Sequence, residues 1–242
     1  MAVALCLSVV FLATLRWRST IALVDNVAAV FEEPEWAGNL GTADRVLDYI
    51  AANPDDAALV VTTLDDGHDG LRHNDDARMP LASTMTIVHL AAWAQAVESG
   101  RIDPSAEIAV ERWKAWHLPN TDGGSHDDAL EALGIEGATG AATWDGVARA
   151  MVRFGDHAAA DLIREELGGA RLDAAAREGG LPSHDPITSM AGVLLTYRDH
   201  DRPGGDSDLV ETLLGQPVAA RIAMSDRRAE QLVGDPVWAA EE

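Results

Sequence analysis

The stretch that most constrains the fold is residues 83–99, STMTIVHLAAWAQAVES. It is apolar nearly all round a helical wheel, and Gly100 follows it as a C-terminal stop signal. A helix without a polar face is usually buried at the centre of a domain. We therefore expect a buried central helix here.

The rest of the chain predicts a mixture of helices and short strands. Apolar periodicity predicts further helices at residues 42–53, 144–152, 158–167, 187–197 and 209–214. Residues 57–64 and 71–81 are expected to form a two-stranded hairpin around the turn-forming DDGHDG. Residues 101–142 are rich in turn signals and are expected to be mainly loop.

Composition narrows the range of functions. The 242 residues are 47% hydrophobic, which is enough for one sizeable core. Asp and Glu total 40 against 18 basic residues, so the net charge is -22, and Lys114 is the only lysine. Such a charge argues against binding nucleic acid or anionic lipid, both of which require basic residues. The single cysteine, Cys6, excludes an internal disulfide and a cysteine-based zinc site.

The N-terminus predicts export. Residues 1–15 are apolar and uncharged, and Arg16-Trp17-Arg18 follow. The stretch is shorter than the roughly 20 residues of a membrane span, so it suits a signal peptide or an uncleaved anchor. We expect a leader or membrane anchor over residues 1–30, a second region over residues 31–242, and an extracytoplasmic protein that is secreted or membrane-anchored.

Ser83 is the first candidate for chemistry. It lies in the first turn of the expected buried helix, and a second polar side chain, Thr86, follows three residues later on the same helix face. Such a serine could be an N-cap that accepts a backbone hydrogen bond. It could instead be a nucleophile whose own N–H helps to form an oxyanion hole at the helix N-terminus.

A family resemblance favours the nucleophile. The segments that carry it are AALVVTTLDDGHDGLRHNDDARM, PLASTMTIVHLAAWAQAVESGRIDP, LPNTDGGSH and ATWDGVARAMVRFGDHAAADLIREELGG. In order, spacing and flanking hydrophobic residues they resemble the serine β-lactamase and penicillin-binding-protein superfamily, especially its class A-like serine hydrolases. The resemblance implies a helical core beside an antiparallel sheet and a serine that becomes acylated.

The motif residues depart from the family pattern. Where the family has S-x-x-K, this chain has Ser83 and, at the lysine position, Thr86. Threonine has no accessible basic form near neutral pH and cannot replace the lysine as a base. Where the family has S-D-N, the chain has Gly155, Asp156 and His157, so only the aspartate of that motif is present.

The family's third motif, K-T-G, is missing from the sequence, because Lys114 is followed by Ala115. The resemblance therefore implies an incomplete sheet, and we expect either the front part of a longer protein or a shortened relative. By the same resemblance His157 would face Ser83 across the cleft, where imidazole could act as the base with Asp156 nearby.

Histidines elsewhere do not predict a metal site. Four of them adjoin an aspartate, but their spacings match no ligand motif; they are His68, His126, His184 and His200. No metal ion and no cofactor is predicted.

Together these observations predict an α+β fold and a β-lactamase-like serine hydrolase with catalytic candidates Ser83, Thr86, Asp156 and His157. By resemblance its substrates are β-lactam or peptidoglycan-type amides, and the altered motifs indicate impaired or lost activity. The alternative is a non-catalytic member of the same fold that binds cell-envelope fragments or a partner protein. The sequence predicts no nucleic-acid partner and indicates no oligomeric state.

Overall fold

The computed structural model describes residues 43–55, 57–62, 70–79, 81–135, 140–197, 212–213, 215–235 and 238–239. The chain forms two compact units that divide between Pro80 and Leu81. The predicted leader lies outside the described residues, as do Cys6, His68, His200 and most of the helix predicted at residues 209–214.

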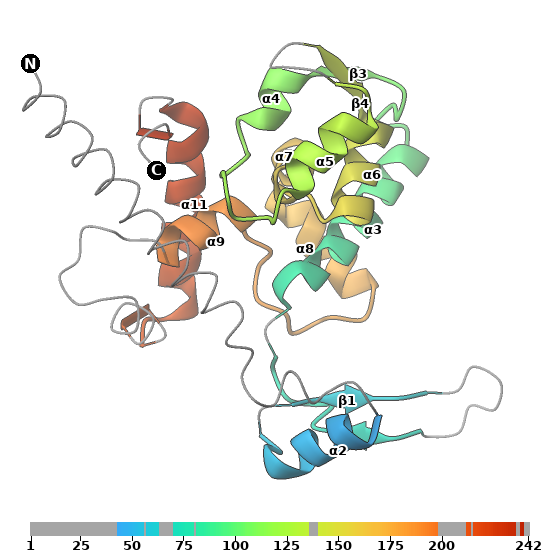
Figure 1. The fold of residues 1–242 in the computed structure, drawn as a ribbon, viewed down its shortest axis with the longest axis vertical. Helices are drawn as coiled ribbons and strands as arrows, with labels where there is room; N and C mark the ends of the chain where they lie inside the picture. Colours follow the sequence, from blue (N-terminus) through green and yellow to red (C-terminus); the bar gives the residue numbers. More distant parts are fainter. Residues whose placement is uncertain are drawn as a thin grey trace, which may run out of the picture. The chain divides into compact units, whose positions relative to one another are not determined.

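The first unit contains a helix and a strand pair (Figure 1). Helix α2 spans Ala43–Ala52, and the antiparallel strands β1 and β2 span Leu59–Val60 and Arg72–His73. The His73 ring supports the pair, because its Nε2 lies 2.9 Å from the Pro54 carbonyl oxygen. Both the helix and the hairpin predicted for this region are confirmed.

The second unit is mainly helical. It begins with the 3-10 helix η2, Ala82–Met85. Its strands are β3, Glu107–Ala109, and β4, Ala141–Thr143. Its helices are α3 Thr86–Glu98, α4 Val110–Lys114, α5 Ser125–Ala132, α6 Trp144–Phe154, α7 His157–Leu167, α8 Gly169–Glu178, α9 Met190–Tyr197 and α11 Val218–Gly234.

Helix α7 occupies the centre of this unit. It packs against α3, α4, α5, α6, α8 and α9. Three consecutive alanines, Ala158, Ala159 and Ala160, are buried, and so are Leu162 and Ile163. Small side chains let neighbouring helices approach from several sides, and the larger ones fill the remaining space.

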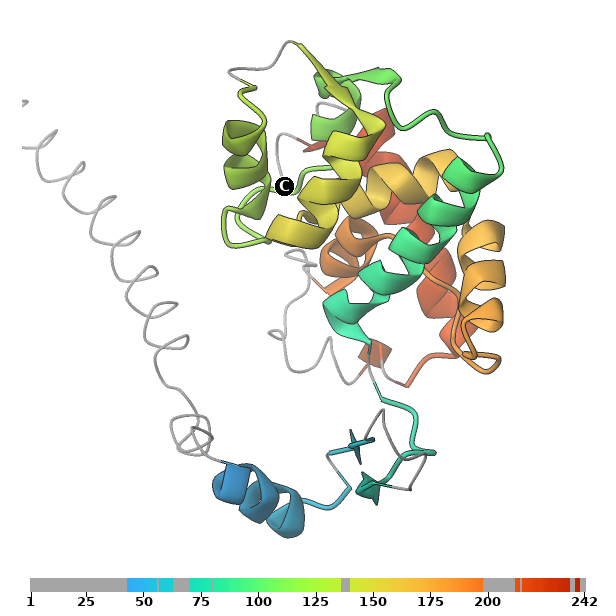
Figure 2. The ribbon, with the colours of Figure 1, turned by 90° about the vertical axis from the view of Figure 1, so that its right-hand side faces the viewer.

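The expectation that residues 83–99 form the buried centre is therefore wrong. In α3, which lies alongside α8 (Figure 2), Val88, Ala92 and Ala96 are buried. The opposite face includes Ile87, whose exposed fraction is 68%, and Leu90, which is also exposed. Within the described residues, only one face of this apolar helix is therefore buried.

Residues 101–142 contain more regular structure than expected. Strands β3 and β4 pair antiparallel, with Ile108 opposite Ala142, and each runs directly into the helix that follows it, α4 or α6. Figure 1 shows this strand pair at one end of the helical unit. The combination of helices with small antiparallel sheets confirms the predicted α+β class.

Asp161 fixes how α9 begins. It is a fully buried residue in the middle of α7, and its carboxylate accepts hydrogen bonds from the backbone N–H groups of Met190 and Ala191, each at 2.8 Å. The Ser189 hydroxyl donates a third, also at 2.8 Å. The N–H groups at a helix start lack intrahelical acceptors, and Asp161 supplies one from another element.

No helix within the described residues is both long and apolar enough to cross a membrane.

Candidate functional site

Ser83 lies on an exposed turn at the start of α3. The turn is η2, and none of its residues is buried. The N-caps of η2 and α3 are Leu81 and Met85, and neither cap makes a side-chain hydrogen bond. The interpretation of Ser83 as an N-cap is therefore wrong, and its side chain stands in solvent.

Ala82, immediately before Ser83, has a left-handed backbone. Its φ is 47°, in a region that residues with a side chain rarely adopt. The turn is held by Thr84, whose backbone N–H donates to the Leu81 carbonyl oxygen at 3.0 Å and whose hydroxyl donates to the same oxygen. These bonds hold the backbone in the conformation that presents Ser83.

Thr86 is engaged with the backbone of the same turn. Its Oγ1 donates to the Ser83 carbonyl oxygen at 2.9 Å. A threonine hydroxyl has one hydrogen to donate, so this bond uses it. The position that the resemblance assigns to the lysine thus holds a side chain that stabilises the turn.

Asp156 is buried at the start of α7, where it has two partners. One carboxylate oxygen caps the helix by accepting from the Ala159 N–H at 3.1 Å. The other lies 3.0 Å from Nδ1 of His126, which is also buried. The retained aspartate therefore connects α7 to α5, and its role in catalysis stays a prediction.

His126 is the centre of an aromatic cluster. The Trp113 ring meets it edge-on, with centroids 5.3 Å apart, and the His117 ring stacks on it at 4.3 Å. Burial, reinforced by the neighbouring His126 ring, lowers the pKa of His117. The cluster joins α4 and the segment after it to α5, whose His126 also contacts Asp156 at the start of α7.

His157 is the first residue of α7 and is half-buried. Its Nδ1 has no hydrogen-bond partner among the described residues. The described hydrogen bonds do not join its ring to Ser83, so its role as a base stays a prediction. Gly155, two residues earlier, ends α6 with a φ of 77°.

His89 is buried in α3, with Nδ1 3.1 Å from the Met85 carbonyl oxygen. Burial lowers the pKa of His89 to about 4, so its ring is neutral at ordinary pH. It is a core side chain, as a histidine inside a packed helix is expected to be.

Within the described ranges no group of three or more His, Cys, Asp or Glu side chains could hold a metal ion. His126 pairs with Asp156, and Nδ1 of His184 lies 2.6 Å from the Asp185 carbonyl oxygen.

Sequence reasoning missed the pairing of His126 with Asp156. Thirty positions separate the two residues, and neither lies in a motif that points to the other. Asp122-Gly-Gly-Ser-His126 was part of the segment that carried the resemblance, but only the fold brings His126 to the start of α7.

Comparisons with known proteins give one family. The sequence model of the beta-lactamase enzyme family matches residues 42–194. Among solved structures, this chain is similar to the beta-lactamase from Sphaerobacter thermophilus DSM 20745, with a TM-score of 0.47 and 19% sequence identity, over 74% of this chain and 67% of that chain. A search of curated proteins gives no match.

Proposed function

Because the chain belongs to the beta-lactamase enzyme family, we propose that it is a serine hydrolase whose Ser83 is slowly acylated by β-lactam or peptidoglycan-type amides. We propose also that it acts outside the cytoplasm, as a secreted or anchored protein. The apolar, uncharged residues 1–15 support that location.

The conformation of Ala82 carries the proposal. A non-glycine residue at positive φ costs roughly 1–2 kcal/mol, and such strain concentrates at functional sites. Here the strained residue, at a φ of 47°, directly precedes an exposed serine at the start of a packed helix. Other hydrolases also present a nucleophilic serine on a strained turn before a helix.

The proposed step is acyl transfer. The Ser83 oxygen forms a bond to the amide carbonyl carbon, and the amide C–N bond breaks. The hydroxyl proton passes to a base and then to the departing nitrogen, which in a β-lactam stays attached through the opened ring. Hydrolysis of the ester by water would release the acid and restore Ser83.

Thr86 is the reason that we expect the step to be slow. Its hydroxyl donates to the Ser83 carbonyl and cannot take the proton from the serine. A positioned base typically contributes on the order of 10²–10⁴ to the rate. His157 is the candidate replacement, because its Nδ1 has no hydrogen-bond partner among the described residues.

The test is covalent labelling. Purified protein is incubated with a fluorescent penicillin for increasing times and examined by denaturing gel and intact mass. We expect a slow rise to one label per chain, absent in Ser83→Ala, with no cephalosporin turnover above that of the variant. Ser99→Ala is the matched control, because Ser99 follows the other end of α3.

The second candidate function is non-catalytic binding of cell-envelope fragments or a partner. The occupied Thr86 hydroxyl favours it, since a binding protein needs no base. In that case no label forms, and penicillin or muropeptides bind equally to wild type and Ser83→Ala. Labelling that Ser83→Ala leaves unchanged would contradict the proposed nucleophile.

A further inference from the structure

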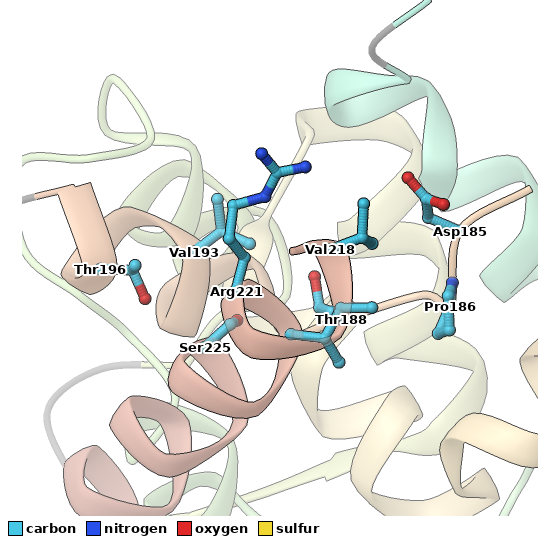
Figure 3. A pocket seen from close by; sticks show the side chains of 9 residues that line it. Asp185, Pro186, Thr188, Val193, Thr196, Val218, Arg221 and Ser225 are labelled. Carbon is cyan, nitrogen blue, oxygen red and sulfur yellow. The ribbon is translucent and has the colours of Figure 1, made fainter. Parts of the chain in front are cut away.

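A cavity of about 180 Å³ lies between residues 185–188, α9 and α11 (Figure 3). Its lining combines apolar side chains with hydroxyl groups, among them Val193, Val218, Ile222, Thr188, Thr196 and Ser225. A cavity of about 150 Å³ is enough for benzene, so this one suits a ligand of about six to nine non-hydrogen atoms.

The walls of this cavity are fixed by polar contacts to the central helix. Asp161 of α7 accepts the hydrogen bonds that start α9. Arg164, also on α7, donates to the Ile187 carbonyl oxygen at 3.1 Å and to Asp226 of α11 at 2.7 Å. All the elements around the cavity are thus held by one helix, as in a preformed binding site.

Gly192 lets α9 lie directly against α11. A Cβ at this position would stand 2.2 Å from the Ser225 carbonyl oxygen and 2.8 Å from its hydroxyl oxygen, so a larger residue would push the two helices apart. Because the helices are this close, Ser225 is only 2% exposed although it lines the cavity. The packing therefore places a hydroxyl group deep in an otherwise largely apolar part of the wall.

The hydroxyl of Ser225 supplies the observation that points to a ligand. It has no hydrogen-bond partner within the described part of the chain. Hydroxyls inside helices commonly donate to the carbonyl four residues earlier, as Thr196 does to Gly192 at 2.8 Å. Figure 3 shows the Ser225 oxygen directed towards the Arg221 side of the cavity. A buried hydroxyl without a partner is costly, and a ligand with a polar atom at that depth would satisfy it.

The charged residues beside the cavity favour an uncharged ligand. Asp185 and Arg221 also line it, and each already interacts with other groups of the chain. A charged ligand would therefore lose its water without gaining a free opposite charge. The apolar side chains of Val193, Val218 and Ile222 suit a hydrocarbon skeleton instead.

We propose that this cavity binds a small neutral alcohol or phenol, a compact hydrocarbon skeleton that carries one hydroxyl group. The ligand's hydroxyl hydrogen-bonds with Ser225, and its carbon atoms contact Val193, Val218 and Ile222. This site is independent of the acyl transfer proposed for Ser83.

Phenol and toluene give the sharpest test, because they have the same shape and differ by a hydroxyl in place of a methyl group. The full-length chain is titrated with each probe, and binding is followed by NMR of the methyl groups of Val193 and Ile222. We expect saturable shifts of these signals with phenol. The absence of saturable shifts, or shifts confined to other parts of the chain, overturns the proposal.

Ser225→Ala then tests the hydrogen bond. Toluene is the more apolar probe, so the quantity compared between proteins is the ratio of phenol affinity to toluene affinity. This ratio should be about 3- to 10-fold lower in Ser225→Ala than in wild type, the worth of one neutral hydrogen bond. Ser99→Ala, which removes a hydroxyl at the end of α3, should leave the ratio unchanged. An unchanged ratio in Ser225→Ala contradicts the assigned contact.

Thr188→Trp tests the location. Thr188 lines the cavity from the segment before α9, so a tryptophan there should fill the space without altering a helix. Saturable binding of both probes should be lost in this variant while its urea denaturation remains cooperative. Phenol binding that persists in the folded variant contradicts the assigned site, and the ratio measured in Ser225→Ala decides the matter if Thr188→Trp does not fold.

Discussion

The Thr86 hydroxyl donates a hydrogen bond to the Ser83 carbonyl oxygen, with 2.9 Å between the two oxygens. The bond closes the turn on which Ser83 stands, directly after the strained Ala82. In this chain the third residue after the serine therefore has a structural role. That role bears on whether restoring a lysine there would restore a catalytic site.

We predict that Thr86→Lys alone raises the rate of Ser83 acylation by less than about 10-fold. A lysine at this position shares the helix face of Ser83, but acylation also needs N–H donors on the developing oxyanion, and the loss of one donor costs roughly 10²–10³ in rate. The chain has no K-T-G motif to complete that arrangement, because Lys114 is its only lysine. The substitution also removes the hydrogen bond that holds the turn.

The measurement is the initial rate of fluorescent penicillin labelling, with Ser83→Ala as the blank. Thr86→Val, which has the shape of threonine without the hydroxyl, reports the cost of the lost bond and should destabilise the fold by about 1 kcal/mol. Rapid, Ser83-dependent labelling of Thr86→Lys would show that the rest of the site is intact.

Gly155→Ser, which would restore the first residue of the S-D-N motif, should destabilise the protein by about 1 kcal/mol. Gly155 ends α6 with a φ of 77°, and a Cβ there would meet no atom within 4 Å. The penalty is therefore one of backbone conformation, so Gly155→Ala should cost the same and Gly155→Asn less. Urea denaturation measures all three.

Gly169→Ala serves as the control for that series. Gly169 begins α8, and a Cβ added there also meets nothing within 4 Å, but its backbone is not left-handed. This substitution should be neutral or stabilising. A Gly155→Ser protein as stable as wild type would show that the end of α6 rearranges freely.

The buried pair of Asp156 and His126 should contribute more to the free energy of unfolding than an ordinary helix cap does. Asp156→Ala removes both the bond to the Ala159 N–H and the partner of His126, so we expect a loss of about 3 kcal/mol or more. Thr143→Ala removes the cap of α6 alone and should cost about 1 kcal/mol.

A double-mutant cycle with His126→Phe isolates the pair. We expect a coupling free energy of about 1–3 kcal/mol between positions 126 and 156, measured by urea denaturation of the wild type, both single variants and the double variant. Additive single effects would mean that the side chains act independently.

Local signals predicted some of these features and not others. The apolar spacing from Trp144 predicted α6, and in the structure the Thr143 hydroxyl caps this helix by accepting from the Gly146 N–H. Helix α11 was missed, because its buried positions are filled by Ser225, Ala229 and Leu232, which give a weak apolar pattern.

Local sequence signals also predicted only part of the candidate site. The position of Ser83 at the start of a helix followed from sequence, whereas the left-handed Ala82 did not, since alanine carries no signal for positive φ. The place of Asp156 in a motif was visible, but its partner His126 is 30 positions away and is brought there by packing of α5 against α7. Contacts of that range depend on the whole fold.

His89 should make the protein less stable as the pH falls. Burial lowers the pKa of His89 to about 4 in the folded state, against 6.5 as its ordinary value. The unfolded chain therefore binds more protons between these values, and stability is lost as the pH drops from 6.5 to 4, by about 3 kcal/mol at most. His89→Leu should remove this dependence, whereas His184→Gln should not, in urea titrations at several pH values.

Asp161 should have the opposite effect on stability to His89: it should make the protein less stable as the pH rises, over much of the same pH range. Burial, which outweighs its three hydrogen bonds, raises the pKa of Asp161 to about 6 from 3.8. The folded state then binds more protons than the unfolded state between these values, so this group's contribution to stability falls as the pH rises from 4 to 6. Asp161→Asn removes the titration, so the stability of the wild type relative to this variant should decrease over that interval.

Wild-type stability should change less between pH 4 and pH 6 than the stability of Asp161→Asn or His89→Leu, because the pH dependences of Asp161 and His89 oppose each other. If the difference between wild type and Asp161→Asn instead grows as the pH rises, the hydrogen bonds outweigh burial and the carboxylate is charged throughout.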